Sequence, residues 1–431
     1  MKKKILLAIA TAVGLWVSCT ESADKGSKWL SVERTSYEAV NPEGEVISIP
    51  VQCRDKWTAT ANSTWCLPYN TQGNNGDMLI LQATANITGE ERTATVTLSA
   101  EGEQVTIELR QSTVTTASAE EYHYTLPVVF HVLYENSANP LEYVDPSRLY
   151  TILEAVNRLY ADRNDGEIDL NVSFVPAEIG PDGKTLDTPG VEYIRWPWSY
   201  PISCTDFMSE STGRYTDYIW DPNLYINIML YTFEQTDDES DILGISHMPY
   251  SVQGTDAPEG LNEVGRTFLQ KSNLLYPYSV SINNRYLYAS SASDNIVSTL
   301  AHELGHYLGL YHVFAESEDG EQDLCIDSDY CTDTPTYNRT EYMLWVLTTA
   351  QDASFAVQAQ RVDCQSGESY TSRNIMDYAY GYTDSFTPQQ RERVRYVLSH
   401  SPLIPGPKVY TTAGVRTAGK GKLQLPIRTM K

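Results

Sequence analysis

Basic residues and long apolar runs are both scarce in this chain of 431 residues. Lysine and arginine number 31 against 56 aspartates and glutamates, which gives a formal net charge of −25. That charge argues against binding to nucleic acid and suits a soluble, secreted surface. Beyond the N-terminal segment, no apolar run reaches the roughly 18 residues that a membrane span needs. The length leaves room for two or three domains.

Histidine is scarce as well, yet three of the seven histidines fall within the stretch HELGHYLGLYH. His302 and His306 are four residues apart, so both imidazoles leave one face of a predicted helix and can bind one zinc ion. Gly309 lets that helix end, and the chain can then turn to bring His312 back as a third ligand. Three protein ligands leave a fourth position for water, which is typical of a catalytic zinc site.

Glu303 follows the first ligand and is placed to act as a general base. Zinc lowers the pKa of a bound water to about 7, and a carboxylate within hydrogen-bond reach can then take its proton. The helix that carries this motif is predicted to begin at Ser293 or Asp294. Both are good cap residues, and apolar residues recur after them at helical spacing.

The spacing H-E-x-x-H-x-x-G-x-x-H is the metzincin signature, which a Met-turn follows downstream. The stretch SRNIMDYAYGY supplies Met376 for that turn. A lone methionine is more simply a core residue. Together with the zinc motif, Met376 is expected to form an apolar floor beneath the zinc ligands.

Longer stretches resemble one family in particular. HELGHYLGLYHVF, CTDTP, NIMDY and FTPQQRERV resemble the pappalysin-like metalloproteases of family M43, cytophagalysin branch, over roughly residues 122–403. The resemblance implies that Tyr378 lies near the metal and stabilises the oxyanion of the tetrahedral intermediate, a role that suits a phenol donor. A tyrosine that only packs is the alternative, since the chain has 30 tyrosines.

The sequence departs from this family at the substrate pocket. Pappalysin relatives often prefer arginine, and an acidic residue before a cysteine lies at the floor of their pocket. Tyr382 and Thr383 stand in those two places here, and Asp384 comes only afterwards. A pocket walled by Tyr380 and Tyr382 should favour apolar or aromatic side chains, so we predict no strict arginine preference.

An acidic segment follows the zinc motif. Its carboxylates offer oxygen ligands for calcium, which related enzymes bind near this loop; a solvated acidic loop is the alternative. The candidate calcium ligands are Asp323, Asp327, Asp329 and Asp333.

The N-terminus, MKKKILLAIATAVGLWVSCTES, has the basic and apolar regions of a signal peptide. VSC resembles the end of a bacterial lipobox, so we expect a lipoprotein signal peptide over residues 1–18, lipid on Cys19 and a tether over residues 19–28. The lipid would anchor the protein to the outer membrane of a Bacteroidetes-type bacterium, at its surface or periplasmic face. An ordinary signal peptide with a stray cysteine is the alternative.

Six further cysteines form an even set, which suggests disulfides in an exported chain. Cys53 and Cys66 lie close together in the sequence and are candidates to pair. The other four, Cys204, Cys325, Cys331 and Cys364, allow three connectivities, and the family carries disulfides after the zinc helix.

Residues 29–113 show the period-two alternation of a small immunoglobulin-like β-sandwich. The segment resembles a BACON domain, a module of Bacteroidetes surface proteins for which carbohydrate binding has been proposed. Trp57 and Trp65 could stack on glycans, but core positions are the simpler interpretation. A polar linker over residues 114–121 should join this sandwich to the catalytic domain.

The fold expected overall is α+β, with a metzincin-type catalytic domain over residues 122–405. This domain should hold a twisted mixed sheet, an active-site helix, a second long helix and the Met-turn. Substrate is expected to pair in extended form with an edge strand at Gly244–Pro249. Residues 406–431 are predicted to be a basic, mobile tail. His131 and His247 lack ligand-spaced partners and are expected to be structural.

These inferences predict a zinc metalloendopeptidase that acts on proteins. The rival hypothesis is a surface adhesin or glycan-binding lipoprotein with an incidental protease fold. The rival requires a degenerate metal site, whereas all three ligands and the base are present here. Zinc content, together with cleavage of a denatured protein, would distinguish the two.

Overall fold

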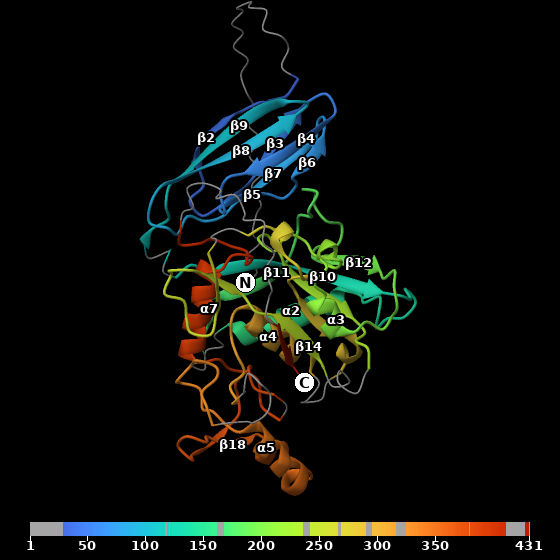
Figure 1. Ribbon diagram of the computed structural model, residues 1–431, viewed down its shortest axis with the longest axis vertical. Coiled ribbons are helices and arrows are strands. Elements are labelled where there is room, and N and C mark those ends of the chain that lie inside the picture. The colour runs from blue at the N-terminus through green and yellow to red at the C-terminus, as the bar shows by residue number, and fades with distance from the viewer. Residues whose placement is uncertain are drawn as a thin grey trace, which may run out of the picture.

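A computed structural model gives the structure of the chain. It describes residues 29–116, 119, 121–161, 168–235, 242–265, 269–289, 295–315, 325–378, 380–410 and 427–430. Three parts follow one another along the long axis: a β-sandwich at the top of Figure 1, a central mixed domain, and a small extension around α5 (Arg339–Trp345) and β18 (Gln360–Val362). Cys19, the signal peptide and the tether lie outside the described residues.

The first part is an all-β sandwich of two sheets, as the alternation predicted. One sheet has the order β1-β3-β7-β5 and the other the order β2-β9-β8-β4-β6. Inward positions such as Ile49, Val51 and Val96 are almost fully buried between them. The strands are β1 (Ser31–Val32), β2 (Ser36–Val40), β3 (Glu45–Gln52), β4 (Lys56–Ala61), β5 (Cys66–Pro68), β6 (Gln72–Asn74), β7 (Met78–Ala83), β8 (Arg92–Ala100) and β9 (Glu103–Gln111).

Both tryptophans at issue belong to the sandwich core. Trp57 is 1% exposed and Trp65 is 5% exposed, so neither offers a face on which a sugar can stack. The expected pairing of Cys53 with Cys66 is wrong, because both cysteines are free. Cys66 pairs with Ala83 of β7, and Ala83 pairs in turn with Glu45 at the start of β3. Cys53 is eight residues beyond Glu45, just past the other end of β3, which at strand spacing puts it about 26 Å away. A disulfide needs Cα atoms within about 7 Å.

The central domain is built on one mixed sheet, which confirms the α+β class. Its order is β11-β10-β13-β17-β14-β20, and β12 also pairs with β10. Strands β10, β13 and β17 run parallel, and β14 runs antiparallel to β17. The strands here are β10 (Tyr124–Tyr134), β11 (Val172–Pro176), β12 (Val191–Arg195), β13 (Ile226–Tyr231), β14 (Gly244–His247), β15 (Tyr250–Val252), β16 (Asn262–Val264), β17 (Val280–Asn283) and β20 (Ile427–Met430).

Two long helices, α2 (Pro146–Tyr160) and α4 (Ile296–Tyr307), pack on each other, and each also packs on a strand of the sheet. The side chain of Asp145 caps α2, and Pro146 occupies the first turn, where its missing N–H costs nothing. The side chain of Asn295 caps α4, so the helix begins just after the predicted caps Ser293 and Asp294, which lie outside the described residues. The other helices are α3 (Cys204–Ser209), α5, α6 (Phe355–Gln358) and α7 (Pro388–His400).

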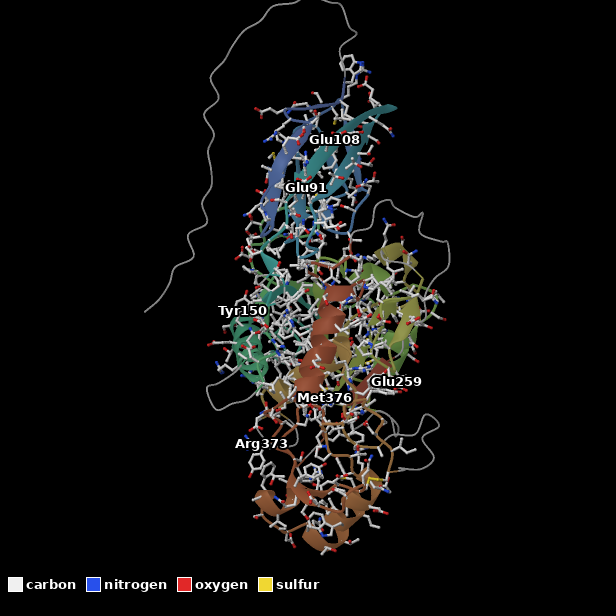
Figure 2. All side chains as sticks on the ribbon, turned by 90° about the vertical axis from the view of Figure 1, so that its left-hand side faces the viewer. Glu91, Glu108, Tyr150, Glu259, Arg373 and Met376 are labelled. Atoms are coloured by element: carbon white, nitrogen blue, oxygen red, sulfur yellow. A yellow bond between two sulfur atoms is a disulfide. The ribbon has the colours of Figure 1, made fainter. Side chains whose placement is uncertain are left out.

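The sandwich is attached to the central domain through an apolar contact as well as through the chain. Leu67 of β5 joins a buried cluster with Val129, Trp220 and Leu224 of the central domain. Figure 2 shows Glu91 and Glu108 on the sandwich at one end of the molecule and Met376 well below it. The sandwich therefore docks on the side of the central domain away from the Met-turn.

The end of the chain differs from expectation. Residues 406–431 were predicted to be a mobile tail, but residues 427–430 form β20 and pair with β14. The outer edge of the predicted substrate strand, Gly244–Pro249, therefore carries a strand of the same chain. A four-residue strand is too short to show a period-two pattern in the sequence, so β20 could not be predicted. The pairing follows from the edge of β14, whose backbone groups would otherwise lack partners in the sheet.

Candidate active site

The three histidines of the zinc motif converge in the interior. Helix α4 carries His302 and His306 on one face, and the chain then turns at Gly309, whose φ is 92°. A Cβ at Gly309 would lie 2.7 Å from Cγ2 of Val397, so the turn requires glycine. Arg393 of α7 donates its Nε–H to the Gly309 carbonyl at 2.6 Å and holds the turn in place.

The ring nitrogens face one another at short range. Nε2 of His312 lies 3.0 Å from Nε2 of His306 and 3.1 Å from Nε2 of His302. A tetrahedral zinc ion with Zn–N bonds of about 2.0–2.1 Å would set its nitrogen ligands about 3.3–3.4 Å apart. Among the described residues, these three form the single group of at least three His, Cys, Asp or Glu side chains that could hold a metal ion.

Hydrogen bonds on the far side of two rings fix their tautomers. Nδ1 of His302 lies 2.8 Å from the carbonyl of Ile375, and Nδ1 of His306 lies 2.8 Å from the carbonyl of Leu310. A carbonyl can only accept, so each Nδ1 donates a proton and each Nε2 keeps its lone pair toward the centre. A proton on Nε2 of His312 could bridge to only one of these two, whereas a cation satisfies all three.

Glu303 and Met376 are both buried, one on helix α4 and the other against it. Glu303 is fully buried, and its side chain packs against Gly244 of β14, where a Cβ would lie 2.6 Å from Cγ of Glu303. Met376 is fully buried beneath α4, and a Cβ on Gly305 would overlap its Sδ. Glycine at position 305 therefore lets the methionine approach the helix between the two ligands.

Tyr378 lies beside the histidines rather than elsewhere in the core. Its ring centroid is 4.6 Å from that of His312 and 5.7 Å from that of His302. The guanidinium of Arg339, in the first turn of α5, lies 4.3 Å from the centroid of the same ring. A cation over an aromatic face is attracted by the ring quadrupole. Sequence reasoning missed Arg339, because no local spacing relates it to Tyr378.

A buried ionic network supports the Met-turn from below. Asp377 accepts hydrogen bonds from the hydroxyl of Tyr337 at 2.5 Å and from the hydroxyl of Ser372. The guanidinium of Arg361, also buried, lies 3.4 Å from the same carboxylate. Burial, followed by the charge of Asp377, raises the pKa of Tyr337 well above its ordinary value, so its hydroxyl remains a donor. The backbone N–H of Tyr378 donates to Asp377 as well, at 2.8 Å.

The three predicted pocket residues have different surroundings. Tyr380 packs in a cluster with Tyr378, next to the histidines. Tyr382 is 42% exposed and packs edge-on against Phe355, 5.1 Å between centroids. Asp384 pairs with Arg373 at 2.5 Å, so its carboxylate already has a cation of the same chain.

The described candidate calcium ligands accept hydrogen bonds from groups of the same chain. Asp323 lies outside the described residues. Asp327 accepts from the backbone of Tyr330 at 3.1 Å, and Asp333 accepts from the backbone of Gln389 at 2.9 Å. Asp329 accepts from the backbone of Cys331 and the hydroxyl of Thr334, and burial raises its pKa to about 8.

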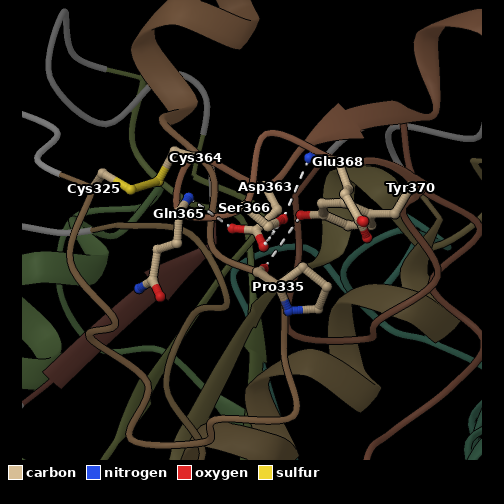
Figure 3. Close-up of a disulfide and its surroundings, with 8 residues drawn as sticks. All are labelled: Cys325, Pro335, Asp363, Cys364, Gln365, Ser366, Glu368 and Tyr370. Atoms are coloured by element: carbon tan, nitrogen blue, oxygen red, sulfur yellow. Dashed lines mark hydrogen bonds between the residues drawn. A yellow bond between two sulfur atoms is a disulfide. The ribbon is translucent and has the colours of Figure 1, made fainter.

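One disulfide, Cys325–Cys364, ties the chain after the zinc motif to the hairpin of β18 and β19 (Ser369–Thr371) (Figure 3). The carboxylate of Asp363 organises the hairpin loop by accepting from the backbone of Gln365 and the hydroxyl of Ser366. Cys331 is free and buried, and Cys204 is buried as well, so Cys325–Cys364 is the pair that the structure shows among these four cysteines.

The two histidines that were expected to be structural, His131 and His247, are buried and hydrogen-bonded within the central domain. His131 lies between Glu192, at 2.7 Å, and Asn227, at 2.9 Å. Nε2 of His247 donates to the carbonyl of Met208 at 3.0 Å, and burial lowers the pKa of this histidine to about 4.

Two regions of the chain match the models of known protein families. Residues 276–399 match the model of the peptidase M43 family, described as pregnancy-associated plasma protein-A, and residues 29–114 match that of the viral BACON domain. An extracellular metalloprotease of Arthroderma benhamiae is 34% identical over 97 residues, 22% of this chain and 29% of that protein. A xyloglucan-specific endo-β-1,4-glucanase of Bacteroides ovatus is 26% identical over 28% of this chain and 24% of that enzyme.

The chain thus spans less than a third of the length of these curated relatives. Among solved structures, a promirolysin mutant of Tannerella forsythia is 19% identical, with a TM-score of 0.45 over 64% of this chain and 80% of that chain.

Proposed function

We propose that this chain, a pappalysin-like M43 metalloprotease by residues 276–399 with a BACON-like domain before them, is a zinc-dependent endopeptidase that cleaves proteins. The observation that carries the proposal is the convergence of three imidazole nitrogens, with Nε2 of His312 lying 3.0 Å from that of His306 and 3.1 Å from that of His302. Two of them are fixed as acceptors by their own hydrogen bonds. Buried lone pairs that face one another are costly unless a cation lies between them.

His302, His306 and His312 would hold the metal, which supplies a lowered pKa for water and polarisation of the scissile carbonyl. The carboxylate of Glu303 would take the proton of the attacking water and pass it to the leaving amine. Glu303 is buried on α4, and the exclusion of bulk water would strengthen each electrostatic contact that it makes during the reaction.

Tyr378 would donate its phenol proton to the developing oxyanion. Its backbone is held by Asp377, and its ring lies under the cation of Arg339. Arg339 is a positioning residue in this proposal, because it acts through the ring of Tyr378 and not on the substrate.

The test is zinc content together with cleavage of denatured casein. The protein is expected to hold one zinc per chain and to lose cleavage on chelation. His302→Ala, His306→Ala and His312→Ala should each lose zinc, whereas His400→Gln, a half-buried histidine stacked on Tyr396, should keep it. Full zinc occupancy in all three alanine variants, or a zinc-loaded wild type with no cleavage, would refute the proposal.

Specificity follows from the pairing of Asp384 with Arg373. A carboxylate that is already neutralised is a weak selector for a substrate guanidinium, so we propose no strict arginine preference. The measurement is a peptide-library profile of wild type and Asp384→Ala. Strict arginine selectivity that disappears in the variant would contradict this.

We also propose that lipid on Cys19 anchors the protein to the outer membrane and that the sandwich acts as a spacer. Support comes from the VSC motif, from the burial of both candidate sugar-stacking tryptophans, and from the docking of Leu67 on the catalytic domain. No helix among the described residues is long and apolar enough to cross a bilayer. Cys19→Ser should release the protein from membranes, and retention in the membrane fraction would rule out this anchor. Calcium and glycan binding remain predictions from sequence.

A further inference from the structure

Strand β14 has both edges paired. One edge pairs with β17, and the other pairs antiparallel with β20. The register places Gly244 opposite Met430, Ile245 opposite Thr429, Ser246 opposite Arg428, and His247 opposite Ile427. The only outward row of backbone N–H and C=O groups on β14 is therefore taken by residues 427–430 of the same chain.

This pairing lies next to the proposed catalytic base. Gly244, at the start of β14, is in contact with Glu303, and its partner Met430 is one strand further out, about 4.8 Å away. Helix α4, which carries Glu303 and two of the histidines, contacts both β14 and β20. Figure 1 shows the dark red end of the chain beside β14 and α4.

We propose that the outer edge of β14 is a binding site for an extended peptide and that residues 427–430 are its resident occupant, which a substrate must displace. The inference rests on the proposed endopeptidase function. An extended chain binds a sheet edge mainly by main-chain hydrogen bonds. One edge holds one strand, so the resident segment and a substrate exclude each other.

The expected effect follows from how much of the time the edge is occupied. A tethered segment binds at an effective concentration of the order of millimolar, so even a weak pairing can be well populated. If the edge is free about one-tenth of the time, the apparent affinity for substrate falls about tenfold. The turnover of bound substrate stays the same, because β20 contributes no group to the reaction.

The experiment compares KM and kcat for a long peptide substrate in three zinc-loaded proteins. The first is wild type and the second lacks residues 427–431. The third is Arg428→Pro with Thr429→Pro. Successive N–H groups of a strand point to opposite sides, so two consecutive prolines remove at least one ladder hydrogen bond. The same double substitution at Thr417 and Ala418, outside β20, is the matched control.

The deletion and the β20 prolines should lower KM about tenfold at unchanged kcat, and the control should equal wild type. A synthetic peptide of residues 422–431 should bind the deleted protein, by fluorescence anisotropy, and inhibit it competitively. A peptide with both prolines should do neither. Equal KM in all proteins, with active enzyme, would overturn the inference and leave the function intact. Absence of cleavage in every zinc-loaded protein would instead refute the proposed function, and the peptide-binding readout would still decide whether the edge takes this segment.

Discussion

Arg92 in the sandwich and the histidines of the zinc motif are all buried, yet their hydrogen bonds differ in kind. Arg92 donates to Gln111 at 2.8 Å and to the carbonyl of Ala85 at 2.8 Å, so its cation is met by acceptors. Burial still lowers the pKa of Arg92 to about 9. In the catalytic domain, Nδ1 of His302 and Nδ1 of His306 each donate to a backbone carbonyl, and the Nε2 of each ring faces Nε2 of His312. The buried cation of the sandwich is therefore met by acceptors of the same chain, whereas in our proposal the histidine cluster binds a cation that the chain does not supply.

The comparison is tested most severely by Glu303→Ala. Removal of a general base typically costs about 10² to 10⁴ in rate, so kcat should fall by that factor while zinc content stays at wild-type level. Glu192→Ala is the matched control, because Glu192 bonds the structural His131 and should leave kcat nearly unchanged. A Glu303→Ala protein with wild-type kcat would show that the base lies elsewhere.

The opposite outcome is expected in the sandwich for Arg92→Met. The variant removes the donor to Oε1 of Gln111 and to the carbonyl of Ala85, and leaves the carbonyl of Thr84 with only the Gln111 amide, which should lower the free energy of unfolding by about 2–4 kcal/mol. The kcat of the folded fraction should not change. Chemical denaturation and peptide cleavage on the same sample check both halves, and a loss of kcat without a loss of stability would contradict the division between the two regions.

His247 extends the comparison to a buried histidine that has no catalytic role. Its folded pKa of about 4 lies below the ordinary 6.5, so the unfolded chain binds a proton that the folded chain does not. Stability should therefore fall as pH drops from about 6.5 to 4, by up to about 3 kcal/mol. His247→Gln should flatten that slope in denaturation curves, and the exposed His123→Gln should not. An unchanged slope in His247→Gln would assign the acid sensitivity to other groups.

The smallest expected effects concern Tyr378 and Arg339. Tyr378→Phe should lower kcat about tenfold with little change in KM, because the proposed hydrogen bond forms mainly in the transition state. Arg339→Met should lower kcat only a few-fold, Arg339→Lys should restore part of it, and the loss should vanish when Tyr378 is already Phe. Additive losses in the double variant would mean that Arg339 does not act through Tyr378.

The convergence of the three histidines could be predicted from sequence because it depends on local geometry. Spacing along one helix and a single turn places His302, His306 and His312, and the strands at β10 and β13 appear as apolar runs. Three contacts could not be predicted, because each joins segments that are distant in sequence. They are the contacts of Arg339 with Tyr378, of Arg361 with Asp377, and of residues 427–430 with β14. Cys53 and Cys66 were expected to pair because they are close in sequence, but extended strands place them far apart and no disulfide joins them.

X-ray absorption spectroscopy of the zinc-loaded protein tests the central claim most directly. The account predicts three imidazole nitrogens at about 2.0–2.1 Å from the metal, with oxygen completing the shell and no sulfur. His312→Ala should lose one imidazole, and His400→Gln should give the wild-type spectrum. A shell that contains sulfur, or one that keeps three imidazoles in His312→Ala, would contradict the assignment of this site.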